Sequence, residues 1–141
     1  MFTAYSPSYL VHNMIDPISG KNKISMGLGL TITVEELHHK LILRLEGRLD
    51  AVTSHILEKK LNALIAEHHH QIILDFFHVH YLSSAGLRLL LSYSKVLKTK
   101  NGGLILVSID EEVMEIIKLA GFESILLIFK NEQDAFKQMK P

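Results

Sequence analysis

The sequence predicts an α/β domain with a mixed β-sheet of about five strands and about four helices, in the order ββαβαβαβα. In the first part of the periodic region, apolar residues recur at every second position, which is typical of half-buried strands. Further along, short unbroken apolar runs alternate with stretches whose apolar residues are spaced by three and four. That pattern indicates strands buried on both faces and joined by helices.

The composition excludes several classes of function. The 15 basic and 15 acidic residues give a formal net charge of +0, so no global field would attract nucleic acid or an anionic membrane. Cysteine is absent, which rules out disulfides, thiolate ligands and a cysteine nucleophile, and fits a cytoplasmic protein. The longest apolar run, residues 125–129, is far shorter than the ~20 residues that cross a bilayer. We expect no membrane insertion.

A change in pattern divides the chain near residue 28. Residues 1–27 mix Pro, Ser, Gly and Asn with apolar residues without a sustained period, which predicts an N-terminal extension, partly ordered or flexible, with room for a short strand. Residues 28–141 are predicted to form the domain. Its first strand, near 28–34, would be an exposed edge that either a second copy or the extension could cover.

The first half of the domain begins with a predicted hairpin, in which alternating strands around 28–34 and 41–46 are joined by the polar residues 35–40. A helix follows, capped by Thr53 or Ser54 and ending near 67–70. The second half is predicted as a strand at 71–76, a helix from Ser84 to about 101, a strand at 104–107, a helix at 111–119, a strand at 125–129 and a short C-terminal helix.

One segment carries a family resemblance. Residues 75–87 read Asp-Phe-Phe-His-Val-His-Tyr-Leu-Ser-Ser-Ala-Gly-Leu, which resembles the signature of the STAS domain, shared by bacterial anti-sigma factor antagonists and sulfate transporter tails. The matching positions are Asp75, Val79, Tyr81, Ser84, Gly86 and Leu87. Gly-Arg-Leu-Asp at 47–50 and Ala-Gly-Phe at 120–122 are similar to two further family elements. Residues 28–139 are thus covered, and the resemblance implies the STAS fold.

The resemblance also implies a function in bacterial transcription regulation by partner switching. As in the antagonists, the unphosphorylated chain would bind an anti-sigma factor that is itself a serine protein kinase, and would so release a sigma factor. Phosphorylation at Ser84 would switch this binding off, and a serine phosphatase would reverse it. The implied partner-binding residues are Asp50, Thr53, Ser83, Ser84 and Gly86. Many antagonists have Asp where Ser83 stands, and this departure leaves the cognate kinase open. Ser83 is also the rival phosphoacceptor.

Each of these residues also has a structural interpretation. Ser84 could be a plain helix cap, a role that Ser83 could fill equally well. Asp50 could be a turn or cap residue that accepts hydrogen bonds from local N–H groups. Asp75 is expected to be structural, bonding loop amides at the end of its strand. Spacing alone leaves these alternatives open.

The remaining motifs favour neither a metal site nor an enzyme. The histidines at 68–70 and the pair His78 and His80 suggest metal ligands, but no Asp or Glu cluster completes a coordination sphere. Neither a phosphate-binding loop nor a nucleophile elbow is present. We therefore expect no metal, no cofactor, no catalytic residue and no direct nucleic-acid binding. The alternative function is a STAS docking subunit of a stress-signalling or transporter complex without a phospho-switch.

Overall fold

The computed structural model describes residues 14–15, 23–27 and 29–139, with side chains described for 29–139. The strands are β1 (Met14–Ile15), β2 (Lys23–Gly27), β3 (Leu30–Leu37), β4 (Lys40–Leu49), β5 (Gln71–Leu82), β6 (Gly103–Val107) and β7 (Leu127–Phe129). The helices are α2 (Ser54–Ala66), α3 (Ser84–Thr99), α4 (Glu111–Leu119) and α5 (Glu132–Gln138).

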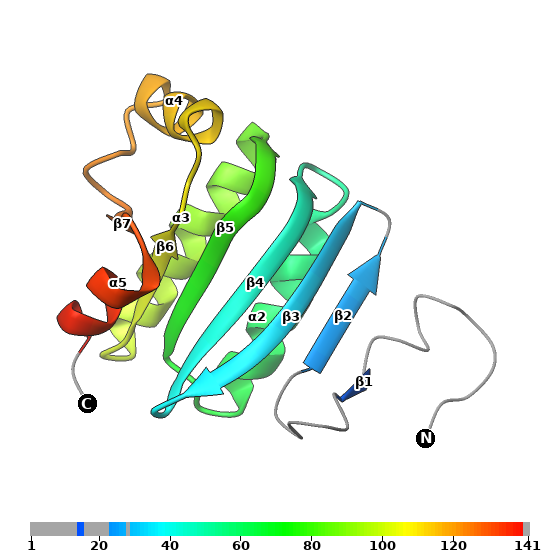
Figure 1. Ribbon diagram of the computed structural model, residues 1–141, viewed down its shortest axis with the longest axis vertical. Helices are drawn as coiled ribbons and strands as arrows, with labels where there is room; N and C mark the ends of the chain where they lie inside the picture. The colour runs from blue at the N-terminus through cyan, green and yellow to red at the C-terminus, as the bar shows by residue number, and fades with distance from the viewer. Residues whose placement is uncertain (1–13, 16–22, 28, 140–141) are drawn as a thin grey trace.

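The seven strands of the described residues form one sheet in sequence order, β1 to β7 (Figure 1). Neighbouring strands are antiparallel from β1 to β4 and parallel from β4 to β7, with α2, α3 and α4 as the connections between the parallel strands. The predicted α/β fold with a mixed sheet is confirmed. The five predicted strands correspond to β3–β7, and β1 and β2 add to them at the N-terminal edge.

The N-terminal strand β2 covers the edge that the sequence left open. It pairs with β3 along its whole length, from Lys23 opposite Val34 to Gly27 opposite Leu30. Of the two alternatives for this edge, the structure therefore shows the N-terminal segment and not a second copy. The short run 23–27 alone has too few alternating positions to be distinguished from a loop. The sequence left room for a short strand in the extension, around apolar residues such as Tyr9, Leu10, Val11 and Ile15, and Ile15 lies in β1. Residues 9–11 lie outside the described residues, and the division at residue 28 stays a prediction.

The β3–β4 hairpin is tighter than the sequence indicates. Leu37 lies opposite Lys40, so only His38 and His39 form the turn, with φ angles of 51° and 68°. Two positive φ values are the pattern of a type I′ turn, which suits the right-handed twist of a hairpin and usually contains Asn-Gly. Because histidines give no such signal, residues 35–37 and Lys40 were expected in the loop, whereas they belong to β3 and β4.

Two apolar clusters cover the two faces of the sheet. The larger one joins the inward residues of β3–β6 to α2, α3 and α4, and includes Leu43, Phe76 and Leu90. The smaller one lies on the opposite face, where Ala135 of α5 packs on Ile42 and Ile73. In Figure 1, α2 and α3 accordingly lie behind the sheet. The predicted alternation is therefore confirmed, since every second residue of β3 and β4 in the predicted strands faces the main core.

Arg44 ties α5 to the sheet on the face opposite the main core. Its guanidinium contacts Glu35 of β3 at 2.9 Å and Asp75 of β5 at 3.0 Å, and it also bonds to Glu132 of α5. The hydrogen bond to Glu132 raises the pKa of Arg44, burial opposes this rise, and the bonds to Glu35 and Asp75 raise the pKa further. Arg44 thus remains charged among three carboxylates and links four elements.

Strand β5 is longer than expected, because it continues beyond residue 76 to Leu82. Its pairing with β4 shifts register twice, between Arg44 and Glu46 and between Gly47 and Leu49. Each shift leaves one extra residue on β5, which interrupts the alternation that a sequence pattern relies on. Strand β7 is shorter than expected and begins at Leu127, since the N–H of Leu126 still bonds to the Phe122 carbonyl in the preceding turn.

The hairpin turn generates a stability prediction. Replacing His39 by Gly should raise the free energy of unfolding, because a positive φ costs a residue with a Cβ on the order of 1–2 kcal/mol. The greater freedom of Gly in the unfolded chain offsets roughly 0.5–1 kcal/mol of that gain. Urea unfolding should therefore show a net stabilisation of up to about 1.5 kcal/mol.

His39→Ala is the matched control for this substitution, since it removes the same imidazole but keeps the Cβ. It should leave stability unchanged or lower it. An equal gain in the Gly and Ala variants would show that the imidazole, and not the backbone conformation, is the unfavourable feature of the turn.

Candidate functional site around Ser84

The first turn of α3 assigns different tasks to the two neighbouring serines. Ser83 is the residue before the helix, with extended backbone angles of φ −89° and ψ 170°, and its Oγ accepts a hydrogen bond of 3.2 Å from the N–H of Gly86. This is the usual geometry of an N-cap. The cap role that was open to either serine is therefore filled by Ser83.

Ser84 is the first helical residue, and its side chain is exposed. Within the part of the chain that the structure describes, its hydroxyl has no hydrogen-bond partner. The hydroxyl thus stands at a fixed position at a helix N-terminus without a structural task. A group added to this oxygen would displace no packed side chain.

The end of β4 holds this first turn in place. The carbonyl oxygen of Leu49 accepts a hydrogen bond of 2.9 Å from the N–H of Ser83. Gly86 is buried at the same contact. A Cβ on this residue would lie 2.9 Å from the Leu49 carbonyl oxygen and 2.9 Å from Leu82 Cδ1. Only glycine permits this approach. Gly86 thus serves the predicted site by bringing α3 and β4 together, and not by offering an exposed side chain.

The loop after β4 lies beside this turn and is organised by Asp50. The Asp50 Oδ1 accepts hydrogen bonds from the N–H groups of Val52 at 3.0 Å and Thr53 at 2.9 Å. The Asp50 carbonyl accepts another from the N–H of Ser54 at 2.9 Å. The expected side-chain cap at Thr53 or Ser54 is therefore replaced by Asp50, because an extra turn precedes α2 and moves the first free N–H groups upstream.

Asp50 is held in its ionised form by these contacts. The hydrogen bond from the Thr53 N–H lowers its pKa, partial removal from water raises it, and the Thr53 hydroxyl, the Val52 N–H and the charge of Arg48 lower it again. The pKa of Asp50 is therefore below its ordinary value. Arg48 Nη2 lies 2.9 Å from Asp50 Oδ2, so the carboxylate beside Ser84 already has a cationic partner.

Thr53 lies inside the loop and is fully buried. Its Oγ1 donates to the Arg48 carbonyl at 2.7 Å and accepts from the Asp50 N–H at 2.8 Å. Thr53 was expected at the partner surface, but its burial restricts it to shaping the loop from below. Any effect of Thr53 on a partner would therefore pass through Asp50 and Val52.

Two exposed apolar side chains accompany these polar residues. Val52, in the loop before α2, is 69% exposed, and Tyr81, near the end of β5, is 49% exposed. Tyr81 was expected only as part of the family motif, and Val52 was not identified from the sequence. The available signal was a branched apolar residue in the turn that precedes a predicted helix. Tyr is enriched at protein interfaces, whereas single exposed apolar side chains also occur elsewhere on this surface, as at Phe77 and Leu119.

A shallow cleft of about 540 Å³ lies at the ends of β5, β6 and β7. It is lined by Phe77, His78, His80, Ser108, Ile109, Asp110 and Lys130. His80 Nδ1 lies 2.7 Å from Asp110 Oδ2, and Asp110 also caps α4 by accepting from the Val113 N–H. Burial raises the pKa of Asp110, but the bonds from His80 and Val113 outweigh it and keep the pKa below its ordinary value.

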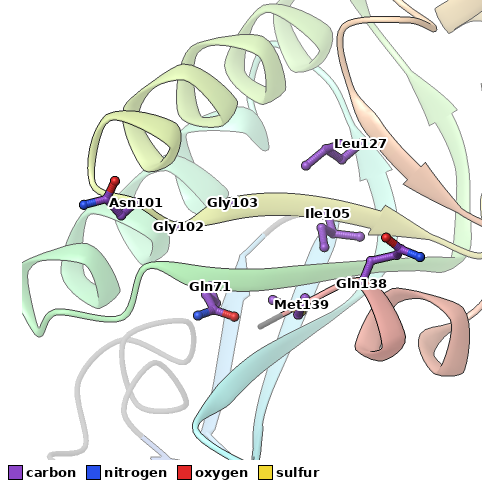
Figure 2. A pocket seen from close by; sticks show the side chains of 8 residues that line it. All are labelled: Gln71, Asn101, Gly102, Gly103, Ile105, Leu127, Gln138 and Met139. Atoms are coloured by element: carbon purple, nitrogen blue, oxygen red, sulfur yellow. The ribbon is translucent and has the colours of Figure 1, made fainter. Parts of the chain in front are cut away.

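A second cleft, of about 250 Å³, lies at the opposite ends of these strands (Figure 2). It is lined by Gln71, Asn101, Gly102, Gly103, Ile105, Leu127, Gln138 and Met139. It shares no residue with the first turn of α3.

Asp75 was expected to bond loop amides at the end of its strand. Its Oδ1 accepts a hydrogen bond of 3.0 Å from the Phe77 N–H, which lies within β5.

Residues 29–139 contain no group of three or more His, Asp or Glu side chains that could hold a metal ion. Among the described residues, no helix has both the length and the apolar character that a membrane span requires.

Comparison with known proteins gives the site its context. Residues 31–135 match the family model described as the STAS domain. BtrV of Bordetella bronchiseptica, described as a candidate anti-sigma factor antagonist, is 29% identical over 79% of this chain and 96% of its own length. The anti-sigma F factor antagonist of Paenibacillus polymyxa is 25% identical over 79% of this chain and 97% of its own length.

Solved structures show the same fold. An anti-sigma factor antagonist from Mycobacterium paratuberculosis has a TM-score of 0.73 at 23% identity and covers 83% of this chain and 99% of its own. Bacillus SpoIIAA in its phosphorylated form has a TM-score of 0.59 at 20% identity, with coverages of 76% and 97%. The murine anion transporter Slc26a9 has a TM-score of 0.63 at 23% identity, with coverages of 73% and 18%. With its matched residues spanning β3 to α5, the chain belongs to the STAS domain family.

Proposed function

We propose that this chain is an anti-sigma factor antagonist controlled by phosphorylation of Ser84. In its unphosphorylated form it binds an anti-sigma factor with serine kinase activity in the bacterial cytoplasm, and a sigma factor is released. A serine phosphatase restores the binding form after phosphorylation. The relatives of similar length that carry the antagonist description support the first part of this proposal.

The proposed phospho-switch is supported by the different contacts of Ser83 and Ser84. Ser83 holds the helix N-terminus through its hydrogen bond to Gly86, whereas the Ser84 hydroxyl is exposed and uncommitted in the described structure. The Ser84 Oγ would form a bond to the γ-phosphorus of ATP, ADP would leave, and the hydroxyl proton would pass to a base of the kinase. The chain itself then needs no catalytic residue.

A phosphate at this place changes the surface much more than the fold. It adds about −1.5 to −2 charges at a helix N-terminus, where the helix dipole tolerates an anion. In a partner interface the same charge must lose water and meets any acidic group of the partner, which costs several kcal/mol. Since about 1.4 kcal/mol changes a dissociation constant tenfold, ~3 kcal/mol weakens binding roughly a hundredfold.

Asp50, Val52 and Tyr81 form the rest of the proposed partner surface, together with Ser83 and Ser84. The two exposed apolar side chains provide area that a partner can bury, and Asp50 provides a fixed negative charge. Thr53 and Gly86 support this surface from below. The alternative, a constitutive docking subunit of a signalling or transporter complex, would use the same surface without the switch, and the likeness to a transporter-borne domain supports it.

The phosphoacceptor can be identified directly. Wild type, Ser84→Ala and Ser83→Ala are incubated with ATP and lysate of the native cell, and the phosphorylated residue is located by mass spectrometry. We expect phosphate on Ser84 in the wild type and in Ser83→Ala, which loses only a helix cap of about 1 kcal/mol. Ser84→Ala should remain unmodified. Phosphate on Ser83 of the wild type would overturn the assignment.

The switch itself is tested by affinity capture from the same lysate. Wild type and Ser84→Ala should recover an ATP-binding kinase-like protein, and Ser84→Asp should not. Ser92→Asp is the matched control, since Ser92 is an exposed serine of the same helix two turns further on. It should bind as the wild type does. Equal recovery by all four baits would instead indicate the constitutive docking subunit.

A further inference from the structure

Arg88 follows Ser84 by four residues on α3 and is exposed. Within the described residues it makes no ion pair and no side-chain hydrogen bond. It lies in the N-terminal half of a helix whose first turn contains no acidic residue. The positive end of the helix dipole and a guanidinium therefore lie close together without a compensating negative charge on the helix.

The helix geometry directs Arg88 toward Ser84. Residues four apart lie on one face of a helix, with Cβ atoms about 5–6 Å apart. Long side chains lean toward the helix N-terminus, so the Arg88 guanidinium can extend over the turn that begins with Ser84. No rearrangement of the backbone is needed for this approach.

The neighbouring loop does not compete for this role. Its cation, Arg48, lies 2.9 Å from Asp50 and so already has an anionic partner. Asp50 in turn is fixed by the N–H groups of Val52 and Thr53. His80, near the end of β5, is paired with Asp110, which follows the neighbouring strand β6. Among these groups, Arg88 is the cation that remains uncommitted.

We propose that Arg88 pairs with a phosphate on Ser84, so that phosphorylation closes an ion pair along the first turn of α3. This inference rests on the proposed phosphorylation of Ser84 and adds a mechanism to it. A guanidinium can bind two phosphate oxygens at once, and the phosphate has about twice the negative charge of a carboxylate. The pair also removes Arg88 from the surface offered to an acidic group of the partner. Phosphorylation thus has two effects on the partner surface: it adds the negative charge of the phosphate, and it engages the Arg88 guanidinium in an ion pair.

The test uses full-length chain with phosphoserine incorporated at residue 84 during translation, so that no kinase is needed. The second pKa of the phosphate, ordinarily about 6, is measured by ³¹P NMR titration. A cation beside the phosphate favours the dianion, so this pKa should be lowered in the wild type. Arg88→Gln should raise it by roughly 0.5 units. The ¹⁵N–¹H signal of the Arg88 side chain should shift on phosphorylation as the pair forms.

Two variants control for the loss of one positive charge. Lys95→Gln removes an exposed cation from the same helix about three turns from residue 84, and its titration should match the wild type. Equal pKa values in the wild type and Arg88→Gln would overturn the inference, as would a rise in Arg48→Gln that Arg88→Gln does not show. Failure of the proposed function is seen separately, as absence of phosphate on Ser84 in the lysate experiment.

Discussion

The contact between the Leu49 carbonyl oxygen and the first turn of α3 is the constraint on which the site depends. The Leu49 carbonyl oxygen accepts a hydrogen bond of 2.9 Å from the Ser83 N–H, and the absence of a Cβ on Gly86 lets the helix come this close. The end of β4 is thereby fixed to the beginning of α3, although α2 and β5 lie between Leu49 and Ser83 in the chain. The loop organised by Asp50 and the helix that begins at Ser84 form one surface for this reason.

The core supports this constraint from both sides of the sheet. Parallel pairing of β4 with β5 brings Leu49 opposite Leu82, immediately before the two serines. The apolar contacts of α2 and α3 fix the helices against one face of the sheet, and the Arg44 cluster fixes α5 against the other. A rigid platform of this kind suits a switch by charge, because the energy of a new phosphate then appears at the interface and is not spent on refolding.

The elements with strong periodicity could be predicted from the sequence. The helix at 111–119 has the predicted bounds, and the positive φ of Gly121 explains why it stops there. The type I′ turn at His38 and His39 was missed, because its residues carry no turn signal. The register shifts in β5 were missed because pairing with β4, a non-local interaction, determines them.

The residues of the candidate site could be proposed from the sequence, but the contacts that each of them makes could not. The family motif identified Ser84, whereas only the structure shows that Ser83 carries the cap and leaves the Ser84 hydroxyl free. The burial of Thr53 and the exposure of Val52 depend on how the loop folds over its own backbone, which spacing cannot reveal. The proposed role of Arg88 follows from two observations. The first turn of α3 has no acidic residue, and Arg48 is already paired with Asp50.

The central claim is that a phosphate on Ser84 alters a surface and leaves the fold intact. The most direct measurement compares backbone amide NMR spectra and hydrogen exchange of the chain with serine and with phosphoserine at residue 84. The account predicts shift changes confined to residues 48–53 and 81–88, with unchanged protection of the amides in β4, β5 and β6. Loss of protection in β5 or along α3 would contradict it, because phosphorylation would then act by unfolding the site.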